Sequence, residues 1–122
     1  MTGVAVVVED DPGLTMIYRM VLEEVNFEVL QASDGGKAMD VLRDCVPDIL
    51  FLDILLPNVN GLAVLDYMAE AEHLQSTQIV IVSSNLRFEQ DILDMQLRQP
   101  LQFILKPIRP ATIRELATNL AH

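Results

Sequence analysis

Acidic side chains follow two apolar segments of the chain at the point where each segment ends. Glu9, Asp10 and Asp11 come directly after the run VAVVV, and Asp53 comes directly after DILFL. Three or more carboxylates gathered in a partly desolvated cleft repel one another, and a hard divalent cation with oxygen ligands is the usual resolution. Because no His or Cys accompanies these acids, zinc is disfavoured. The pattern therefore predicts a Mg²⁺ site, provided that the fold brings the two segments together.

A hydroxyl and an ammonium group occupy the same kind of position. Ser83 ends the run QIVIVS and is followed by Ser84, while Lys106 follows LQFIL. A carboxylate, a hydroxyl, an ammonium and a metal ion are the groups that phosphoryl transfer requires, with Asp53 as the attacking nucleophile. Each position by itself also has a structural explanation, such as a helix cap or a surface lysine. The hypothesis therefore depends on the joint placement of these residues at the ends of four different apolar segments.

Five short apolar segments alternate with five segments of helical periodicity. The apolar segments are residues 4–8, 27–32, 48–53, 78–83 and 101–105, and the helical segments are residues 12–25, 34–45, 61–74, 85–99 and 110–121. Strands separated by such helices form right-handed crossovers and a parallel sheet covered on both faces, with ligands at the carboxyl ends of the strands. The sequence predicts one three-layer α/β domain over residues 1–122.

The helical periodicity also predicts which side chains face the sheet. In the first helical segment these are Leu14, Ile17, Val21, Leu22 and Val25. Their i, i+3 and i+4 spacing is that of an amphipathic helix with one apolar face. We therefore expect this face to cover the sheet.

The fourth helical segment carries two apolar sets instead of one. One set is Phe88, Ile92 and Met95, and the other is Leu86, Leu93 and Leu97. We expect one set in the core. The other is either additional core, which we favour, or an exposed surface for self-association or partner docking.

Composition and charge exclude several classes of protein. The 122 residues carry a net charge of −10, whereas a nucleic-acid surface needs clustered Lys and Arg. No apolar run approaches the roughly 18 to 20 residues of a membrane span, and the start of the chain has no basic leader. The single Cys45 excludes a disulfide within the chain. We expect a cytoplasmic protein that contacts neither a membrane nor, through this domain, nucleic acid.

These motifs resemble the receiver domain of two-component response regulators, and the resemblance covers the whole chain. VVVEDDPG is similar to the acidic pair of the family, DILLPNVNG to its phosphoacceptor stretch, VIVSS to its fourth-strand motif and FILKP to its fifth-strand signature. The resemblance implies a flavodoxin-like fold: a five-stranded parallel sheet of order 2-1-3-4-5 with five helices.

The resemblance also implies a role for each site residue. Asp53 is the implied phosphoacceptor, and Ser83 and Lys106 are the implied contacts of the phosphoryl group. Mg²⁺ is implied as the cofactor, with four ligands: Glu9, Asp10, Asp53 and the backbone carbonyl of Leu55. A domain of this kind is not an enzyme in the ordinary sense, because it catalyses only its own phosphorylation and dephosphorylation.

The resemblance further implies a switch and a set of partners. Ser83 and Phe103 match the switch positions, although Thr is commoner at the first and Phe103 has no hydroxyl. Pro107 is implied to follow a cis bond, and Gln99 with Pro100 replaces a small Gly-Ala pair. The implied partners are a histidine kinase or phosphotransfer protein and a downstream protein or fused output domain. A homodimer through the fourth helix, fifth strand and fifth helix is also implied.

Three alternatives stay open. A pseudo-receiver would use the same fold as a phosphorylation-independent interaction module, and absence of Mg²⁺ binding would favour it. A flavodoxin-type cofactor binder needs a phosphate-cradling loop after the first strand, where this chain has the acidic EDDPG. A haloacid-dehalogenase-like phosphatase needs a second acid two residues after the nucleophile, where Leu55 lies. We rank the receiver first and the pseudo-receiver second.

Overall fold

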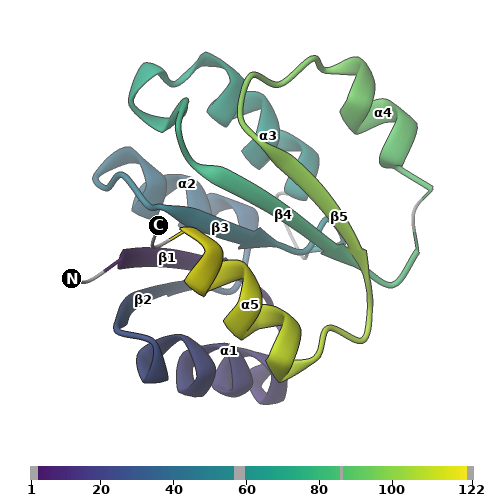
Figure 1. Ribbon diagram of the computed structural model, residues 1–122. Coiled ribbons are helices and arrows are strands. Elements are labelled where there is room, and N and C mark those ends of the chain that lie inside the picture. The colour runs from purple at the N-terminus through teal and green to yellow at the C-terminus, as the bar shows by residue number, and fades with distance from the viewer. Residues whose placement is uncertain (1–2, 57–59, 86, 121–122) are drawn as a thin grey trace.

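A five-stranded parallel sheet forms the centre of the molecule (Figure 1). The computed structural model describes residues 3–56, 60–85 and 87–120. Within these ranges the strands are β1 (Gly3–Val8), β2 (Phe27–Ala32), β3 (Ile49–Leu52), β4 (Gln78–Ser83) and β5 (Leu101–Leu105). Their order is β2-β1-β3-β4-β5 and every neighbouring pair is parallel, which confirms the predicted flavodoxin-like sheet.

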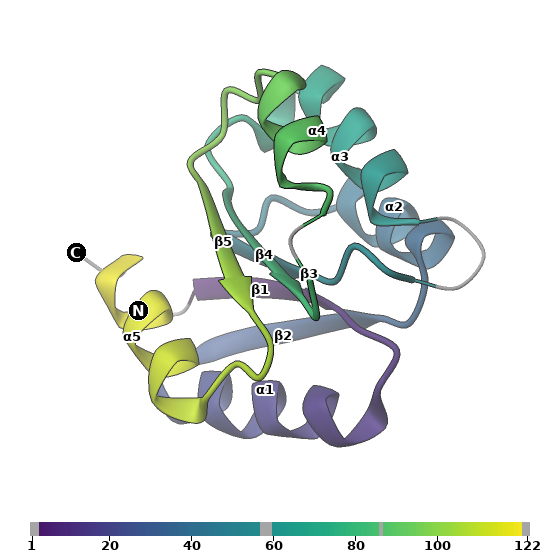
Figure 2. The ribbon, with the colours of Figure 1, turned by 90° about the vertical axis from the view of Figure 1, so that its right-hand side faces the viewer.

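Helices cover both faces of this sheet. They are α1 (Pro12–Glu24), α2 (Gly35–Arg43), α3 (Gly61–Glu70), α4 (Glu89–Asp94) and α5 (Pro110–Leu120), with a short 3-10 helix η1 (Glu72–Leu74). Helices α1 and α5 lie on one face, and α2, α3 and α4 lie on the other (Figure 2). None of the helices in the described ranges combines the length and apolar character that a membrane span requires.

Polar side chains fix where the first three helices begin. Asp11 caps α1 by accepting a hydrogen bond from the Gly13 amide, and Pro12 occupies the first helical position. Asp34 caps α2 through the Lys37 amide, and Asn60 caps α3 through the Ala63 amide. Each cap satisfies an amide that would otherwise lack an intrahelical partner. Three of the βα loops therefore end at a defined residue.

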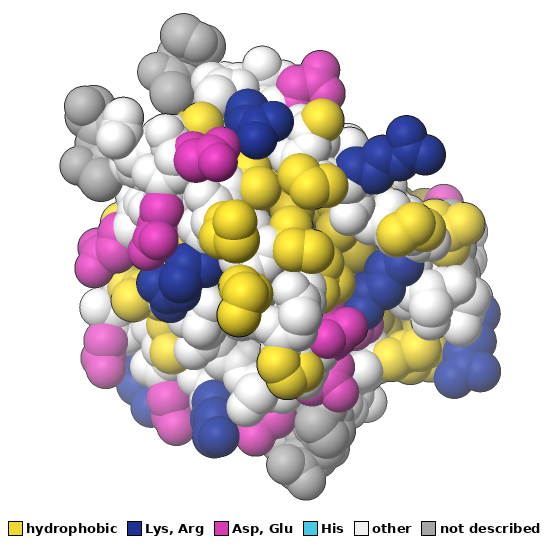
Figure 3. Space-filling view, turned by 90° about the horizontal axis from the view of Figure 1, so that it is seen from below, with side chains coloured by type: hydrophobic (Ala, Val, Ile, Leu, Met, Phe, Trp, Pro, Cys, Tyr) yellow, Lys and Arg dark blue, Asp and Glu magenta, His cyan; other side chains and the backbone are white. Residues whose placement is uncertain are grey.

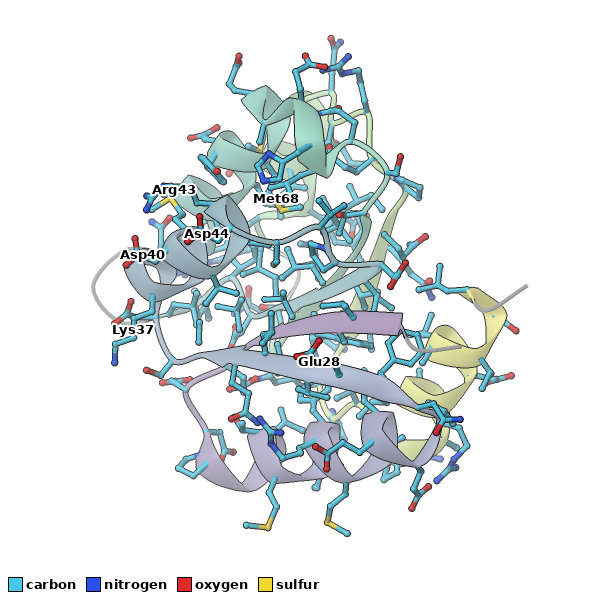
Figure 4. All side chains as sticks on the ribbon, turned by 90° about the vertical axis from the view of Figure 1, so that its left-hand side faces the viewer. Glu28, Lys37, Asp40, Arg43, Asp44 and Met68 are labelled. Atoms are coloured by element: carbon cyan, nitrogen blue, oxygen red, sulfur yellow. The ribbon has the colours of Figure 1, made fainter. Side chains whose placement is uncertain are left out.

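Helix α2 shows how the layers are built. Figure 4 shows Lys37, Asp40 and Arg43 on its outer side, where Arg43 and Asp40 form an ion pair of 3.1 Å. Ala38 and Leu42, at helical spacing on the opposite side, are fully buried. This division is the amphipathic pattern expected of a helix that covers a sheet.

The fourth helix is much shorter than predicted. The sequence predicted a helix over 85–99, whereas α4 spans only Glu89–Asp94. Before it, the Asn85 side chain accepts a hydrogen bond from the Arg87 amide, which stabilises a local turn in place of a helix. After it, Gln96 adopts a left-handed backbone conformation with φ of 55°, which ends a helix.

The two apolar sets of the fourth helical segment differ in burial. Ile92 is buried, and Phe88 and Met95 pack against the core, as predicted for the first set. In the second set Leu97 also packs against the core, but Leu93 is 48% exposed. The preference for additional core is therefore wrong for Leu93. Leu86 lies outside the described residues.

The third helix also ends earlier than predicted. The sequence predicted a helix over 61–74, but α3 ends at Glu70, and the extended backbone of Ala71 separates it from η1. The Gln75 side chain donates hydrogen bonds to the carbonyls of Met68 and Ala71, and the buried Gln99 side chain also donates to Met68. These amides replace the missing helical hydrogen bonds. Through this hydrogen bond Gln99 joins the turn before β5 to the end of α3.

Candidate functional site

The carboxyl ends of β1, β3, β4 and β5 bring the predicted polar residues to one edge of the sheet. The backbone continues the sheet ladder beyond each strand: the Glu9 amide donates to Ala32, the Asp53 amide to Val8 and the Lys106 amide to Ser83, at 3.1, 3.1 and 2.8 Å. These hydrogen bonds fix the first residue of three loops. Glu9, Asp53 and Ser83 are each buried, with at most 6% of the residue exposed.

Lys106 bridges the two buried acids. Its Nζ atom lies 3.0 Å from Oδ2 of Asp53 and 3.1 Å from Oε1 of Glu9. The other oxygen of each acid accepts a backbone hydrogen bond, Oδ1 of Asp53 from the Leu55 amide at 2.9 Å and Oε2 of Glu9 from the Asp11 amide at 3.2 Å. Both carboxylates are therefore held in fixed orientations.

Burial and hydrogen bonding act in opposite directions on the pKa values of Glu9 and Lys106. Burial raises the pKa of Glu9, and the hydrogen bonds from Lys106 and the Asp11 amide only partly offset the rise. For Lys106, burial acts to lower the pKa, but the hydrogen bonds to Asp53 and Glu9 outweigh it, so the pKa is raised. Lys106 therefore stays protonated and supplies a fixed positive charge beside Asp53.

Three carboxylates at this edge lie close enough to share a cation. Each of Glu9, Asp10 and Asp53 offers one oxygen, and these oxygens lie within 4.8 Å of one another. Glu9 and Asp53 are buried, whereas Asp10 is exposed. Asp10 and Leu55 line one cleft of about 350 Å³. An all-oxygen donor set that opens onto a cleft fits a hard cation such as Mg²⁺.

The remaining predicted residues have other contacts in the structure. Asp11 caps α1 instead of joining the three carboxylates. The Ser83 hydroxyl accepts a weak hydrogen bond from the Asn85 amide at 3.5 Å, and Ser84 is exposed. Ser83 and the partly buried Phe103 line one small cavity of about 10 Å³.

Pro107 follows a cis peptide bond, which confirms that expectation. The bond joins Pro107 to Lys106, the residue that bridges the two acids.

Gly61 contributes to the site through its size. Its amide donates to the carbonyl of Ile54 at 3.0 Å. A β-carbon at this position would lie 2.7 Å from Cα of Ile54 and 3.0 Å from the carbonyl oxygen of Asp53. The sequence placed Gly61 only at the start of a helical segment, because a close backbone approach leaves no signal in a single sequence. Gly61 lets α3 begin directly against the segment that carries Asp53.

We expect Gly61→Ala to destabilise the protein by about 1–3 kcal/mol, because the added methyl group overpacks against backbone. Urea unfolding monitored by circular dichroism measures this change. Gly36→Ala is the matched control, because a β-carbon there would meet only Oδ1 of Asp34, at 3.4 Å. An unfolding midpoint for Gly61→Ala equal to that of the control would contradict the account.

Comparisons with known proteins agree on one family. The model of the response regulator receiver domain matches residues 5–118. The polar-differentiation response regulator DivK of Brucella ovis is 30% identical over 84 residues, which are 69% of this chain and 68% of DivK. DivK proteins of other Brucella strains match equally well.

Solved structures show the same fold. A CheY-like receiver domain from Methylobacillus flagellatus superposes with a TM-score of 0.82 at 20% identity, covering 98% of this chain and 99% of that one. The receiver domain of the sensor histidine kinase PA1611 from Pseudomonas aeruginosa, which holds a magnesium ion in its active-site cleft, gives 0.84 at 17% identity and covers 100% of both chains. With the family model spanning nearly the whole sheet and its helices, this chain belongs to the response regulator receiver domains of two-component systems.

Proposed function

We propose that residues 1–122 form one receiver unit that accepts a phosphoryl group on Asp53 in a Mg²⁺-dependent reaction. A histidine kinase or phosphotransfer protein supplies the group from a phosphohistidine. The observation that carries the proposal is the arrangement around Asp53, whose carboxylate lies 3.0 Å from Lys106 and within 4.8 Å of the Glu9 and Asp10 oxygens. A nucleophile, a cation and further metal-binding oxygens are thus in one place.

Asp53 is suited to act as the nucleophile. The Leu55 amide holds Oδ1, which leaves Oδ2 as the oxygen that exchanges its partner during the reaction. An Asp53 oxygen attacks phosphorus, a new P–O bond forms, and the P–N bond to the donor imidazole breaks. The bonding electron pair stays on the imidazole nitrogen. The product is an aspartyl phosphate, and no oxidant or further reactant is required.

The acids of this site would hold Mg²⁺ through the carboxylates of Glu9, Asp10 and Asp53 and the Leu55 carbonyl. The bound ion would supply positive charge against the phosphoryl oxygens. Lys106 is fixed in place before the reaction and needs little movement to contact a phosphoryl group on Asp53. Its charge stabilises the transferred group without reorganisation.

The surface beside Lys106 offers the phosphodonor a place to dock. Figure 3, which views the side that carries α1 and α5, shows hydrophobic side chains gathered on the surface. On α1 these include Met16 and Met20, which are 64% and 59% exposed. Ile17 and Lys106 line one cleft of about 610 Å³. A phosphohistidine carried on an apolar helical face could therefore reach Asp53 from this side.

We further propose that the signal leaves through α4, β5 and α5. Attraction of Ser83 to the phosphoryl group would enlarge the cavity that it shares with Phe103, and Phe103 could turn into that space. Leu93 on α4 and Leu105 on β5 are 48% and 53% exposed and could contact a downstream protein, an output domain or a second copy. The net charge of −10 and the free Cys45 support a cytoplasmic role that involves no nucleic acid.

Metal removal tests the proposal. With phosphoramidate as the phosphodonor and Mg²⁺ present, we expect intact-mass analysis to show one added phosphoryl group, and with excess chelator none. We expect Asp10→Asn to raise the Mg²⁺ concentration needed for half-maximal phosphorylation about tenfold or more, because one charged ligand is lost.

Asp11→Asn is the matched control for this experiment, because Asp11 is the neighbouring acid that caps α1 outside the metal-binding group. Its Mg²⁺ requirement is expected to equal that of the wild type. Phosphorylation that proceeds equally well in chelator would contradict the proposed role of the acids. No phosphorylation under any condition would favour the pseudo-receiver.

A further inference from the structure

Two glutamine side chains join the turn before β5 to the end of α3. Gln99 donates hydrogen bonds to the carbonyls of Met68 and Leu74 at 2.9 and 3.2 Å. Gln75 donates to the carbonyls of Met68 and Ala71 at 3.2 and 2.8 Å. Met68, which is labelled in Figure 4, therefore accepts a hydrogen bond from both amides. The two side-chain amides meet at this carbonyl, and we call the group the glutamine junction.

The oxygen of each side-chain amide in the junction is buried and lacks a hydrogen-bond partner. Gln99 is 3% exposed, and its Oε1 atom has no partner among the described residues. Gln75 is partly exposed as a residue, but its Oε1 atom is buried and also has no partner in the described part of the chain. Buried polar atoms are nearly always hydrogen-bonded, so two such oxygens in one place call for an explanation.

Turning the amides over does not supply the missing donors. The two ends of a glutamine amide are distinguished by their hydrogen bonds, and here each nitrogen faces two carbonyl oxygens. A reversed Gln99 amide would place its oxygen against the carbonyls of Met68 and Leu74, so that acceptor would face acceptor. Both hydrogens of each amide are already in use. Each oxygen therefore needs a donor from outside the junction.

We propose that the glutamine junction is a binding site for buried water, which donates hydrogen bonds to the amide oxygens of Gln75 and Gln99. Buried water in proteins typically makes about three hydrogen bonds to polar groups that otherwise lack partners. The neighbouring guanidinium of Arg98 does not fill this role, because it contacts Glu72 at 3.5 Å. Gln75 is partly exposed, so the junction borders the surface from which water can enter.

The water site lies beside the first hydrogen bond between β4 and β5. The Pro100 carbonyl accepts that bond from the Ile79 amide at 2.8 Å, and Gln99 directly precedes Pro100. The junction thereby fixes the start of β5, the strand that leads to Lys106. The inference goes beyond the proposed function, because it requires no phosphoryl group on Asp53.

A high-resolution crystal structure of the wild type tests the site directly. We expect ordered water within hydrogen-bond distance of the Oε1 atoms of Gln75 and Gln99. Absence of water density at both oxygens would overturn the inference. A protein donor against Oε1 of Gln99, such as the Arg98 guanidinium, would also overturn it.

Magnetic relaxation dispersion of water tests the site in solution, because it counts the water molecules that stay in a protein for a long time. We expect Gln99→Met, which keeps the length of the side chain, to lose at least one long-lived water relative to the wild type. Gln75→Met is a second variant with the same expected loss. Gln90→Met is the matched control, because Gln90 is exposed and bonds to Asp94. Equal numbers of long-lived waters in the wild type and in both junction variants would overturn the inference.

Amide hydrogen exchange tests whether the junction fixes the start of β5. We expect Gln99→Met to speed exchange of the Ile79 amide by about tenfold or more relative to Gln90→Met, because that amide bonds to Pro100. The Lys106 amide, which bonds to Ser83 at the other end of β5, is expected to change less. Equal acceleration of both amides would indicate a general loss of stability and would overturn the positioning role.

Discussion

Asp53→Asn is expected to reduce phosphoryl incorporation to background. The amide is far less nucleophilic than the carboxylate and cannot form an acyl phosphate. The fold is expected to persist, because an asparagine oxygen can still accept the 2.9 Å hydrogen bond from the Leu55 amide. Intact-mass analysis after incubation with phosphoramidate and Mg²⁺ measures the loss, and circular dichroism measures the fold.

Asp44→Asn provides a matched control for the loss of one acid elsewhere. Asp44 is an exposed residue directly after α2 and lies outside the acidic group. Its phosphorylation is expected to equal that of the wild type. Incorporation by Asp53→Asn at the wild-type stoichiometry would show that another residue is the acceptor.

Lys106→Met is expected to slow phosphorylation by on the order of 100-fold, because it removes a preorganised charge from the transferred group. The Lys106 ammonium is the described cation that contacts both Asp53 and Glu9, at 3.0 and 3.1 Å. Single-turnover phosphorylation with phosphoramidate, followed by mass spectrometry, measures the rate.

Mg²⁺ binding distinguishes this effect from a collapse of the site. Without Lys106 the metal no longer competes with an ammonium for Glu9 and Asp53, so we expect the Mg²⁺ affinity of Lys106→Met to be equal to or higher than that of the wild type. Arg109→Met is the matched control, because Arg109 is an exposed cation three residues further on. A phosphorylation rate for Lys106→Met equal to that of Arg109→Met would refute the role of the lysine.

The fold could be predicted because its signals are periodic and local. Valine-rich runs, helical spacing and capping residues such as Asp34 each act within a few positions, and the topology of a parallel sheet then follows from general packing rules. The same logic predicted that Glu9, Asp53 and Lys106 share an edge, since each comes directly after a strand. The resemblance to a family supplied the strand order and the cis bond before Pro107.

The deviations from prediction depend on side-chain hydrogen bonds and backbone conformations that the apolar pattern does not show. Helix α4 is short because the Asn85 side chain favours a turn and Gln96 adopts a left-handed conformation, and neither choice is visible in an apolar periodicity. Gln99 is buried because it reaches the carbonyls of Met68 and Leu74, 31 and 25 residues away. Side-chain amides of this kind compete with helix formation in ways that a single sequence does not reveal.

The inward-facing residues of α1 also differ from the prediction. The sequence predicted Ile17 as an inward residue, whereas Ile17 is 38% exposed and Tyr18 is 1% exposed. Tyr18 lies four residues from both Leu14 and Leu22, so helical spacing did allow it on the inner face. The prediction did not include Tyr18.

The central claim is that Asp53 is the phosphoacceptor, and locating the phosphoryl group tests it most directly. Wild-type protein phosphorylated by phosphoramidate in Mg²⁺ would be treated with borohydride, which reduces an aspartyl phosphate to homoserine, and then digested and sequenced by mass spectrometry. The account predicts homoserine at position 53 alone, and none when chelator is present during phosphorylation. Homoserine at Asp10 or another acid, or none in Mg²⁺, would contradict it.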